Sequence, residues 1–222
     1  MDTRALSSGD VLAERYRLED LISESNDAFI WRAADQTLNR SVCIQAMAAS
    51  DTRVDAFLEA ARRSTAVTDP RFLRILDIVE NERGQTYLVR EWARAVSLDR
   101  LLRQSSFPNR RAATVVSEIA EAIANAHESG TYHLHLCPGA ILLKESGAVR
   151  ITGLAVDRAL HGPTGSVPPV GGQEQVDVEA IGKLLYVCLA RRWPGGRRDG
   201  LKGAPTEHGR LLRPRQVRAG VS

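Results

Sequence analysis

The chain has 222 residues, 43% of them hydrophobic, and a net charge of only +3 at pH 7. This length and apolar content are sufficient to bury a substantial core, so we expect a folded globular protein. Residues 1–12 lack the charged and then apolar pattern of a signal peptide, and no apolar run is long enough for a membrane span, which excludes both and predicts a cytoplasmic protein.

Predicted strands gather before residue 93, and predicted long helices follow it. The segment at 54–67, closed by Thr68-Asp69-Pro70, is predicted to be a helix. Pro108 opens a second helix, in which apolar residues recur at helical spacing until Gly130 ends it. We find no internal repeat. The order of these elements predicts an α+β fold.

Residues 132–143 follow the second helix and read Tyr-His-Leu-His-Leu-Cys-Pro-Gly-Ala-Ile-Leu-Leu. This segment resembles the catalytic loop of protein kinases, His-Arg-Asp-x-Lys-Pro-x-Asn, with the short hydrophobic strand that follows it. The other segments agree in order with a bacterial serine/threonine protein kinase, and this resemblance implies strands at 16–21, 28–35, 42–47 and 87–92. The resemblance implies a two-lobe kinase-like fold, with an N-terminal segment at 1–12, an antiparallel β-sheet small lobe at 13–93 and a mostly helical large lobe with a basic tail at 94–222.

The reactive positions of the catalytic loop are replaced. By the resemblance, His135 stands where kinases carry the aspartate that accepts the substrate proton, and Cys137 stands at the lysine position. Ala140 replaces the asparagine that holds magnesium, and Gly153 replaces the aspartate of Asp-Phe-Gly. The resemblance therefore implies that neither the base nor a metal ligand remains.

The small lobe has lost the corresponding groups. Gln45 replaces the lysine of the Val-Ala-Ile-Lys strand, and Ala60 replaces its glutamate partner in the helix. Glu59 lies one position away, about 100° around the helix, and should face elsewhere. The turn that covers ATP phosphates in kinases contains no glycine here and carries Glu24 and Asp27, so we expect it to repel a triphosphate.

The resemblance also identifies equivalents of the nucleotide pocket. Cys43 replaces the small alanine above the adenine, and Arg90 occupies the gatekeeper position. The full set comprises Ile22, Ile30, Cys43, Arg90, Glu91, Trp92, Ala93 and Leu142. Desolvation and like-charge repulsion oppose ATP, so we expect no cofactor. An alternative for Arg90 is a bridge to a helix carboxylate.

Two residues of the family's structural frame are kept. The resemblance implies that His133 packs in the core and that Asp177, at the start of a helix over 177–186, holds the backbone of the catalytic loop. Positions that fold the domain are filled, whereas those that contact phosphate, magnesium or substrate are lost together. We therefore predict a catalytically inactive pseudokinase, not an enzyme, that serves as a protein-interaction scaffold.

A closer resemblance involves the small lobe, the Ala-His-Glu-Ser-Gly sequence at 126–130 and the Arg-Trp-Pro sequence at 192–194. These are similar to the intracellular pseudokinase domain associated with the peptidoglycan-precursor (lipid II) flippase of high-GC Gram-positive bacteria. That resemblance implies a role in cell-wall regulation, phosphorylation by an upstream serine/threonine kinase, a forkhead-associated domain as partner, and membrane proximity through a fused or neighbouring membrane protein.

The second half departs from the family in its length. Only 23 residues separate Gly153 from Asp177, and they include a Gly/Pro-rich loop but no Ala-Pro-Glu anchor. The sequence given stops at Ser222, where the family adds its last helices, so the large lobe is expected to be shortened. Thr164 and Thr206 lie in Gly/Pro-rich loops and are candidate phosphorylation sites.

Two other functions stay open as alternatives. The first is a weakly ATP-binding or residual serine/threonine kinase. The second is a metal- or nucleic-acid-binding module, because His133, His135 and Cys137 alternate as ligands on one face of a strand would. We expect no metal site, since the resemblance makes this segment a loop. The three cysteines fall in separate segments, which predicts reduced thiols.

The basic excess lies after residue 190, where nine lysines and arginines face only Asp199 and Glu207. Such a run could contact anionic lipid or nucleic acid. We favour a solvated surface with a linker and expect no nucleic-acid partner.

Overall fold

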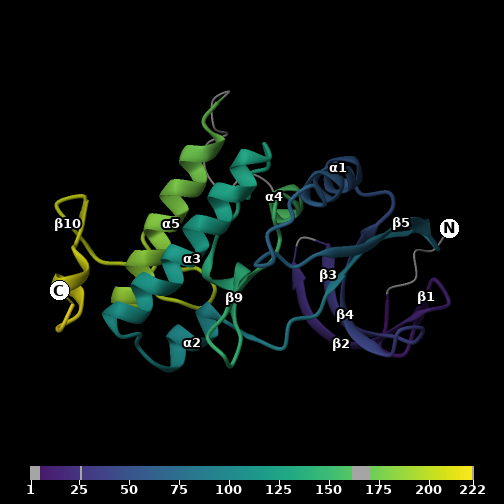
Figure 1. Cartoon of the computed structure of the whole chain (residues 1–222), viewed down its shortest axis with the longest axis horizontal. Coiled ribbons are helices and arrows are strands. Elements are labelled where there is room, and N and C mark those ends of the chain that lie inside the picture. Colours follow the sequence, from purple (N-terminus) through teal and green to yellow (C-terminus); the bar gives the residue numbers. More distant parts are fainter. Residues whose placement is uncertain (1–5, 26, 162–170, 222) are drawn as a thin grey trace. The chain divides into compact units, whose positions relative to one another are not determined.

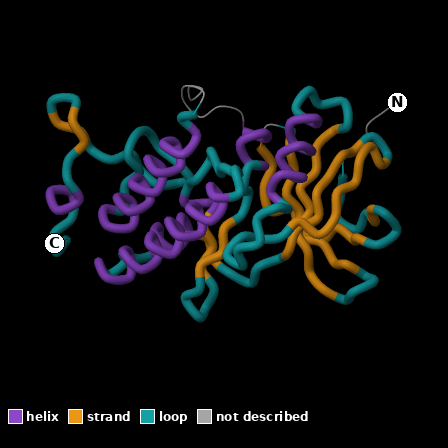
Figure 2. The backbone as a smooth tube through the Cα atoms, turned by 45° about the horizontal axis from the view of Figure 1, so that its top comes forward, coloured by secondary structure: helices purple, strands orange, loops and turns teal. Residues whose placement is uncertain are grey.

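The computed structural model describes residues 6–25, 27–161 and 171–221. It divides the chain into two compact units (Figures 1 and 2). The small unit comprises the chain up to Thr68, Leu73–Ala93 and the segment that starts at Ala155. The large unit comprises Asp69–Phe72, Arg94–Leu154 and the remaining C-terminal part. Among the described helices, none combines the length and apolar character that crossing a bilayer requires.

The small unit is built on a six-stranded antiparallel sheet with the order β1-β2-β3-β4-β6-β5. Its strands are β1 (Val11–Leu12), β2 (Tyr16–Ser25), β3 (Ala28–Asp35), β4 (Arg40–Ala48), β5 (Ile75–Glu82) and β6 (Gln85–Glu91). The turns before β4 and β6 contain Asn39 and Gly84 with φ of +46° and +77°, a conformation that these residue types tolerate best. The predicted strands therefore form where expected.

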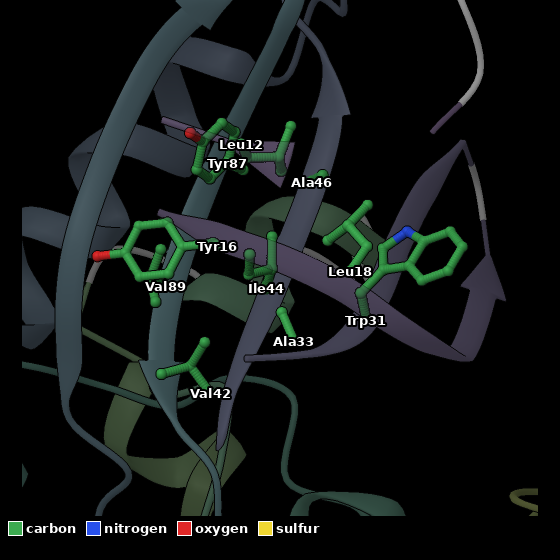
Figure 3. Packing of buried hydrophobic residues seen from close by; sticks show 10 residues of the cluster. All are labelled: Leu12, Tyr16, Leu18, Trp31, Ala33, Val42, Ile44, Ala46, Tyr87 and Val89. Carbon is green, nitrogen blue, oxygen red and sulfur yellow. The ribbon is translucent and has the colours of Figure 1, made fainter. Parts of the chain in front are cut away.

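Each face of this sheet has its own apolar cluster, because side chains alternate along a strand. Figure 3 shows the first cluster, in which Ile44 and Ala46 of β4 lie among residues of the neighbouring strands. On the opposite face, Met47 packs with residues of two helices, α1 (Val54–Ser64) and α4 (Val156–His161). Helices α1 and α4 lie side by side in the small unit (Figure 1).

Helix α1 ends at Ser64 and not at Val67 as predicted. The hydroxyl of Ser64 donates to the carbonyl of Ala61, and that of Thr65 donates to the carbonyl of Arg62. These hydroxyls offer the last carbonyls an alternative to further helical hydrogen bonds, which ends the helix early.

The large unit is mostly helical. Its long helices are α3 (Asn109–Glu128) and α5 (Gln173–Ala190), which pack against each other (Figures 1 and 2). The short elements are β7 (Val96–Ser97), α2 (Leu98–Gln104), the 3-10 helix η1 (Pro138–Ala140), β8 (Ile141–Leu143), β9 (Val149–Ile151), β10 (Thr206–Glu207), β11 (Arg210–Leu211) and α6 (Pro214–Val217). Strands β7, β8 and β9 form a small antiparallel sheet.

A buried ion pair joins residues 69–72 to helix α3. The Asp69 carboxylate, whose side chain is 3% exposed, accepts hydrogen bonds from Arg71 and from Nδ2 of Asn125 at 2.7 Å. Arg71 in turn donates to the carbonyl of Glu118. The hydrogen bonds from Arg71 lower the pKa of Asp69 to about 2.

This pair predicts a defined pH dependence of stability. A lowered carboxyl pKa adds stability above the unfolded-state pKa near 4, and that stability is lost as pH falls toward about 2. We expect Asp69→Asn to cost about 2 kcal/mol at neutral pH, and the difference from wild type to vanish near pH 2. Denaturant melts across this pH range measure it. Asp55→Asn, at an exposed position, is the control, and a pH-independent effect at Asp69 would contradict the assignment.

Candidate functional site

The predicted site residues fall in both units. In the small unit, Cys43 on β4 lies opposite Arg90 on β6, and Gln45 lies opposite Leu88. Directly opposed residues, and residues two apart on one strand, project from the same face of an antiparallel sheet. The register therefore places Cys43, Gln45 and Arg90 together on one face, with Arg90 diagonal to Gln45.

The polar groups on this face are buried and incompletely hydrogen-bonded. Gln45 is 1% exposed and its Oε1 has no partner among the described residues. Arg90 is 3% exposed, and its Nε and Nη1 likewise lack partners there. The Arg90 guanidinium also hydrogen-bonds the Cys43 thiol. Burial raises the pKa of that thiol, and the nearby Arg90 opposes the rise only in part, so Cys43 stays protonated at neutral pH.

The β2–β3 hairpin carries the next candidates. Ile30 lies opposite Gln45 and is half-buried, whereas Ile22 falls at a register shift in β2 and is 52% exposed. Ser25 and Ala28 are the last pair of this hairpin, and Asp27 beyond it is exposed with φ of +57°. A β-bulge turns side chains out of register. It separates Ile22 from the face that holds the other candidates.

The remaining small-unit candidates line the end of β6. The Glu91 backbone N–H donates to the carbonyl of Arg74 at 3.0 Å, and its carboxylate accepts the Arg74 N–H at 3.3 Å. Trp92 and Ala93 follow β6 and are half-buried. The hydrogen bonds between Glu91 and Arg74 fix the backbone at the end of β6, near the end of the segment Leu73–Ala93 of the small unit.

Helix α1, all of which the structure describes, offers no carboxylate to the sheet. Ala60 is half-buried against the apolar cluster between α1 and the sheet. Glu59, one position before it, is 62% exposed and pairs with Arg63 one turn later. Gln45 therefore has no acidic partner from this helix.

The large unit organises its half of the site around Asp177, a fully buried residue of α5. One carboxylate oxygen accepts the backbone N–H of Leu134 at 2.7 Å, and the other accepts that of His133 at 2.8 Å. His127 donates to the same carboxylate at 3.0 Å. Leu134 has φ of +58°, which costs a non-glycine residue about 1–2 kcal/mol. The paired N–H bonds compensate for that strain.

His133 extends this network to the strand that follows. Its Nε2 donates to the carbonyl of Thr152 at 2.9 Å, and its Nδ1 accepts the backbone N–H of His135 at 3.3 Å. These two partners fix one neutral tautomer of the buried imidazole. The Thr152 N–H in turn donates to the carbonyl of Ala140 at 3.0 Å, so three predicted site segments are tied together by backbone contacts.

His135, at the base position, contacts a segment that the sequence did not indicate. Arg198 donates from Nη2 to Nε2 of His135 at 2.7 Å. The adjacent Asp199 accepts the backbone N–H of Gly139 at 3.0 Å. This segment is rich in glycine and follows α5 without apolar periodicity, so no sequence signal pointed to the contact. The Nε2 lone pair of His135 is consequently occupied.

Neither of the two positions at which kinases hold magnesium carries a side chain with a donor atom. Ala140 is buried in η1, and Gly153 follows β9 with φ of +79°. Cys137 is buried and forms no disulfide, and Leu142 is half-buried in β8. Among the described residues, no group of three or more histidine, cysteine or acidic side chains is placed to hold a metal ion. The candidate phosphorylation site Thr164 lies outside the described residues, whereas Thr206 is exposed in β10.

A sequence model of the protein tyrosine and serine/threonine kinase family matches residues 27–167, more than half of the chain. The chain belongs to the protein kinase family. It is 26% identical over 208 residues to a probable serine/threonine-protein kinase PknB of Lactococcus lactis, covering 84% of this chain and 33% of that protein. It is 30% identical over 153 residues to pknA2, a probable serine/threonine-protein kinase of Bifidobacterium longum (65% and 20%). Identity to the serine/threonine-protein kinase PknA of Mycobacterium tuberculosis is 30% over 161 residues (68% and 37%).

Among solved structures, the crystal structure of Rad53 1–466 in complex with AMP-PNP matches with a TM-score of 0.68 at 20% identity, covering 84% of this chain and 52% of that chain. This likeness concerns the fold alone. Together with the family match it confirms the predicted α+β, protein-kinase-like fold. The chain spans between 20% and 37% of the length of the three bacterial relatives.

These findings contradict the prediction of a catalytically inactive pseudokinase scaffold that is not an enzyme. The matching family and the kinase names of the relatives point to an enzyme, and they favour the alternative of a weakly ATP-binding or residual serine/threonine kinase. The prediction treated Gln45 as the loss of the phosphate-binding cation and gave Arg90, at the gatekeeper position, no role in replacing it. The register shows that Arg90, on the adjacent strand, faces the same side as Gln45.

The hydrogen bonds of Asp177 predict a large effect of a small change. Asp177→Asn replaces a charged acceptor of two backbone N–H groups by an amide, and we expect it to lower the free energy of unfolding by roughly 1.5–3 kcal/mol. Urea melts measure this value. Glu179→Gln is the matched control, because Glu179 is 69% exposed and pairs only with Lys183, so it should cost less than about 0.5 kcal/mol. Equal, small losses at both positions would show that Asp177 does not support the loop.

Proposed function

We propose that this chain is a serine/threonine-protein-kinase domain that binds ATP weakly and transfers phosphate slowly. Membership of the protein kinase family and the kinase names of the bacterial relatives support the proposal. Because the chain spans only part of those proteins, their activity is carried over as a proposal. Within it, residues 13–93 would serve as the small lobe and residues 94–222 as the large lobe.

The observation that carries the proposal is the buried guanidinium of Arg90. Diagonal neighbours on adjacent antiparallel strands lie about 7–8 Å apart, within reach of a long side chain. Arg90 is such a neighbour of Gln45, the position at which kinases carry the lysine that contacts ATP phosphates. Arg90 would therefore supply from β6 the positive charge that position 45 of β4 lacks.

Electrostatics favour an anionic ligand at Arg90. Burying a cation without a counter-ion costs several kcal/mol. In the described part of the chain no salt bridge joins Arg90 to a carboxylate, and the Asp157 carboxylate is near enough to the adjacent Cys43 thiol to raise its pKa. The two unpartnered nitrogens are donors, and a guanidinium binds phosphate through parallel N–H groups. A nucleotide phosphate at this face would offset the cost of burying the charge.

The side chains at the predicted catalytic positions of the large unit lead us to expect a slow reaction. Nε2 of His135 already accepts a hydrogen bond from Arg198, so it is not available to accept a proton from a substrate hydroxyl. Absence of a general base lowers a rate by about 10²–10⁴. Ala140 and Gly153 do not fit a magnesium ion held as in other kinases, and we derive no step through one. Positioning and charge stabilisation would account for the remaining activity.

Partners are proposed on the sequence resemblance alone. The resemblance carried by the small lobe and by residues 126–130 and 192–194 supports three partners. These are a forkhead-associated domain, an upstream serine/threonine kinase and a neighbouring membrane protein such as a lipid II flippase. A pull-down from source-cell lysate, with and without phosphatase, tests this. We expect capture of a forkhead-associated protein to be lost after phosphatase treatment. Capture that phosphatase leaves unchanged would contradict the proposal.

The role of Arg90 predicts two opposite effects of Arg90→Met. Without nucleotide, the melting temperature should rise, because an apolar side chain replaces a buried, unpaired charge. With ATP at about ten times the wild-type Kd, wild-type protein should gain about 1.4 kcal/mol, or about 3–6 °C, whereas the variant should gain almost nothing. Thermal melts with an ATP titration measure both effects.

Two further variants make this experiment decisive. Arg62→Met removes a 60% exposed arginine that pairs with Glu80, and it should keep the ATP-dependent shift. The double variant Gln45→Lys/Arg90→Met returns the cation to β4 and should restore the shift. A full ATP-dependent shift in Arg90→Met, or none in wild type, would contradict the proposed function.

A further inference from the structure

The large unit carries a second concave site that the kinase reaction does not use. A hollow of about 440 Å³ lies where the C-terminal ends of α2 and α5 meet the chain at 200–202 and 217–218. Its cationic lining, which defines the basic hollow, consists of Arg103, Arg191, Arg192, Lys202 and Arg218. Its apolar lining includes the buried side chains of Leu102 and Leu201. The volume is within the range of small-ligand sites, about 300–1,000 Å³.

The charge of the basic hollow is largely uncompensated. Arg103 pairs with Asp99 at 2.9 Å. Arg191 donates to the carbonyls of Leu102 and Arg103, and Arg218 donates to those of Phe107 and Leu189. Carbonyls are neutral, so these bonds orient the guanidinium groups without cancelling their charge. In the described part of the chain, neither group forms a salt bridge.

Helix termini explain only part of this cluster. Cations are stabilised near the C-terminus of a helix, which accounts for Arg191 at the end of α5 and for Arg218 on the carbonyl of Leu189. Arg192 and Lys202 hydrogen-bond no carbonyl and pair with no carboxylate among the described residues. Lys202 is exposed, so its ammonium group is free to contact a ligand in the hollow.

Two residues around the hollow have a left-handed backbone conformation. Arg191 has φ of +56°, an uncommon conformation for a residue with a side chain. Gly200 has φ of +73°, and a Cβ atom there would lie 2.6 Å from Nη1 of Arg103. Glycine is therefore required for the Arg103 guanidinium to lie against the backbone at this wall.

We propose that the basic hollow binds a phosphorylated serine or threonine side chain of a partner protein. Several guanidinium groups converge on one concavity, which suits a compact dianion that accepts paired N–H bonds. A concave site does not match the flat surface of a bilayer, which makes the peptide the better fit. This site goes beyond the proposed kinase activity and does not depend on ATP.

Fluorescence anisotropy with a labelled, alanine-rich peptide carrying one phosphothreonine tests the proposal on the full chain. The double variant Arg192→Gln/Lys202→Gln should weaken binding at least about tenfold, because two charge-assisted contacts are lost. The control Arg197→Gln/Arg215→Gln makes the same charge change at exposed positions outside the hollow and should bind as wild type. Binding should also weaken as salt is raised.

Three further measurements distinguish a phosphopeptide from other ligands with the same chemistry. The unphosphorylated peptide should not bind, and inorganic phosphate should compete only at much higher concentration than the phosphopeptide. Vesicles containing phosphatidylserine should bind to the hollow double variant at least as strongly as to wild type. Each of four results would overturn the proposal. These are equal binding of both peptides, equal competition by inorganic phosphate, vesicle binding that depends on the hollow, and unchanged phosphopeptide affinity in the hollow double variant.

Discussion

The hydrogen bonds from two successive backbone N–H groups to the buried Asp177 carboxylate are the constraint on which the large unit's half of the site depends. They hold Leu134 in a left-handed conformation and thereby set the direction of the chain on either side of it. With Leu134 fixed, His133 can reach the carbonyl of Thr152, which links the loop to the strand that follows. Successive N–H groups in such a turn form an anion-binding concavity, and here the anion is a side chain of α5. The backbone of the catalytic loop is therefore kept even though its reactive side chains differ.

In the small unit the strands keep their pairing, but the buried cation stands on β6 and not at position 45 of β4. Position 45 of β4 carries no cation, but the pairing of β4 with β6 puts Arg90 on the same face. Burial of a guanidinium with unpartnered donors is costly, and a nearby anion lowers this cost. Under the proposed function, Arg90 would contribute to the binding and positioning of a nucleotide, whereas proton transfer would still lack a free base. The proposal of weak binding and slow transfer rests on this set of contacts.

Much of the fold could be predicted because it depends on local signals. Pro108, helical spacing and Gly130 bound a helix that the structure places at Asn109–Glu128. The site could be predicted less well, because its decisive contacts join residues far apart in sequence. The contact of Arg198 with His135 arises in a glycine-rich segment without periodicity, and the bulge at Ile22 depends on strand register. Arg90 was placed in the nucleotide pocket from the sequence, but its diagonal position beside Gln45 depends on the pairing of β4 with β6.

We propose that a kinase domain with a relocated cation retains slow phosphotransfer. Incorporation of labelled phosphate from ATP into the purified chain and into a generic serine/threonine substrate tests it most directly, with a heat-killed sample and Arg90→Met as comparisons. Slow incorporation above the heat-killed control, which survives stringent purification and is lost in Arg90→Met, is the predicted result. No incorporation above the heat-killed control, or incorporation that Arg90→Met leaves unchanged, would contradict it.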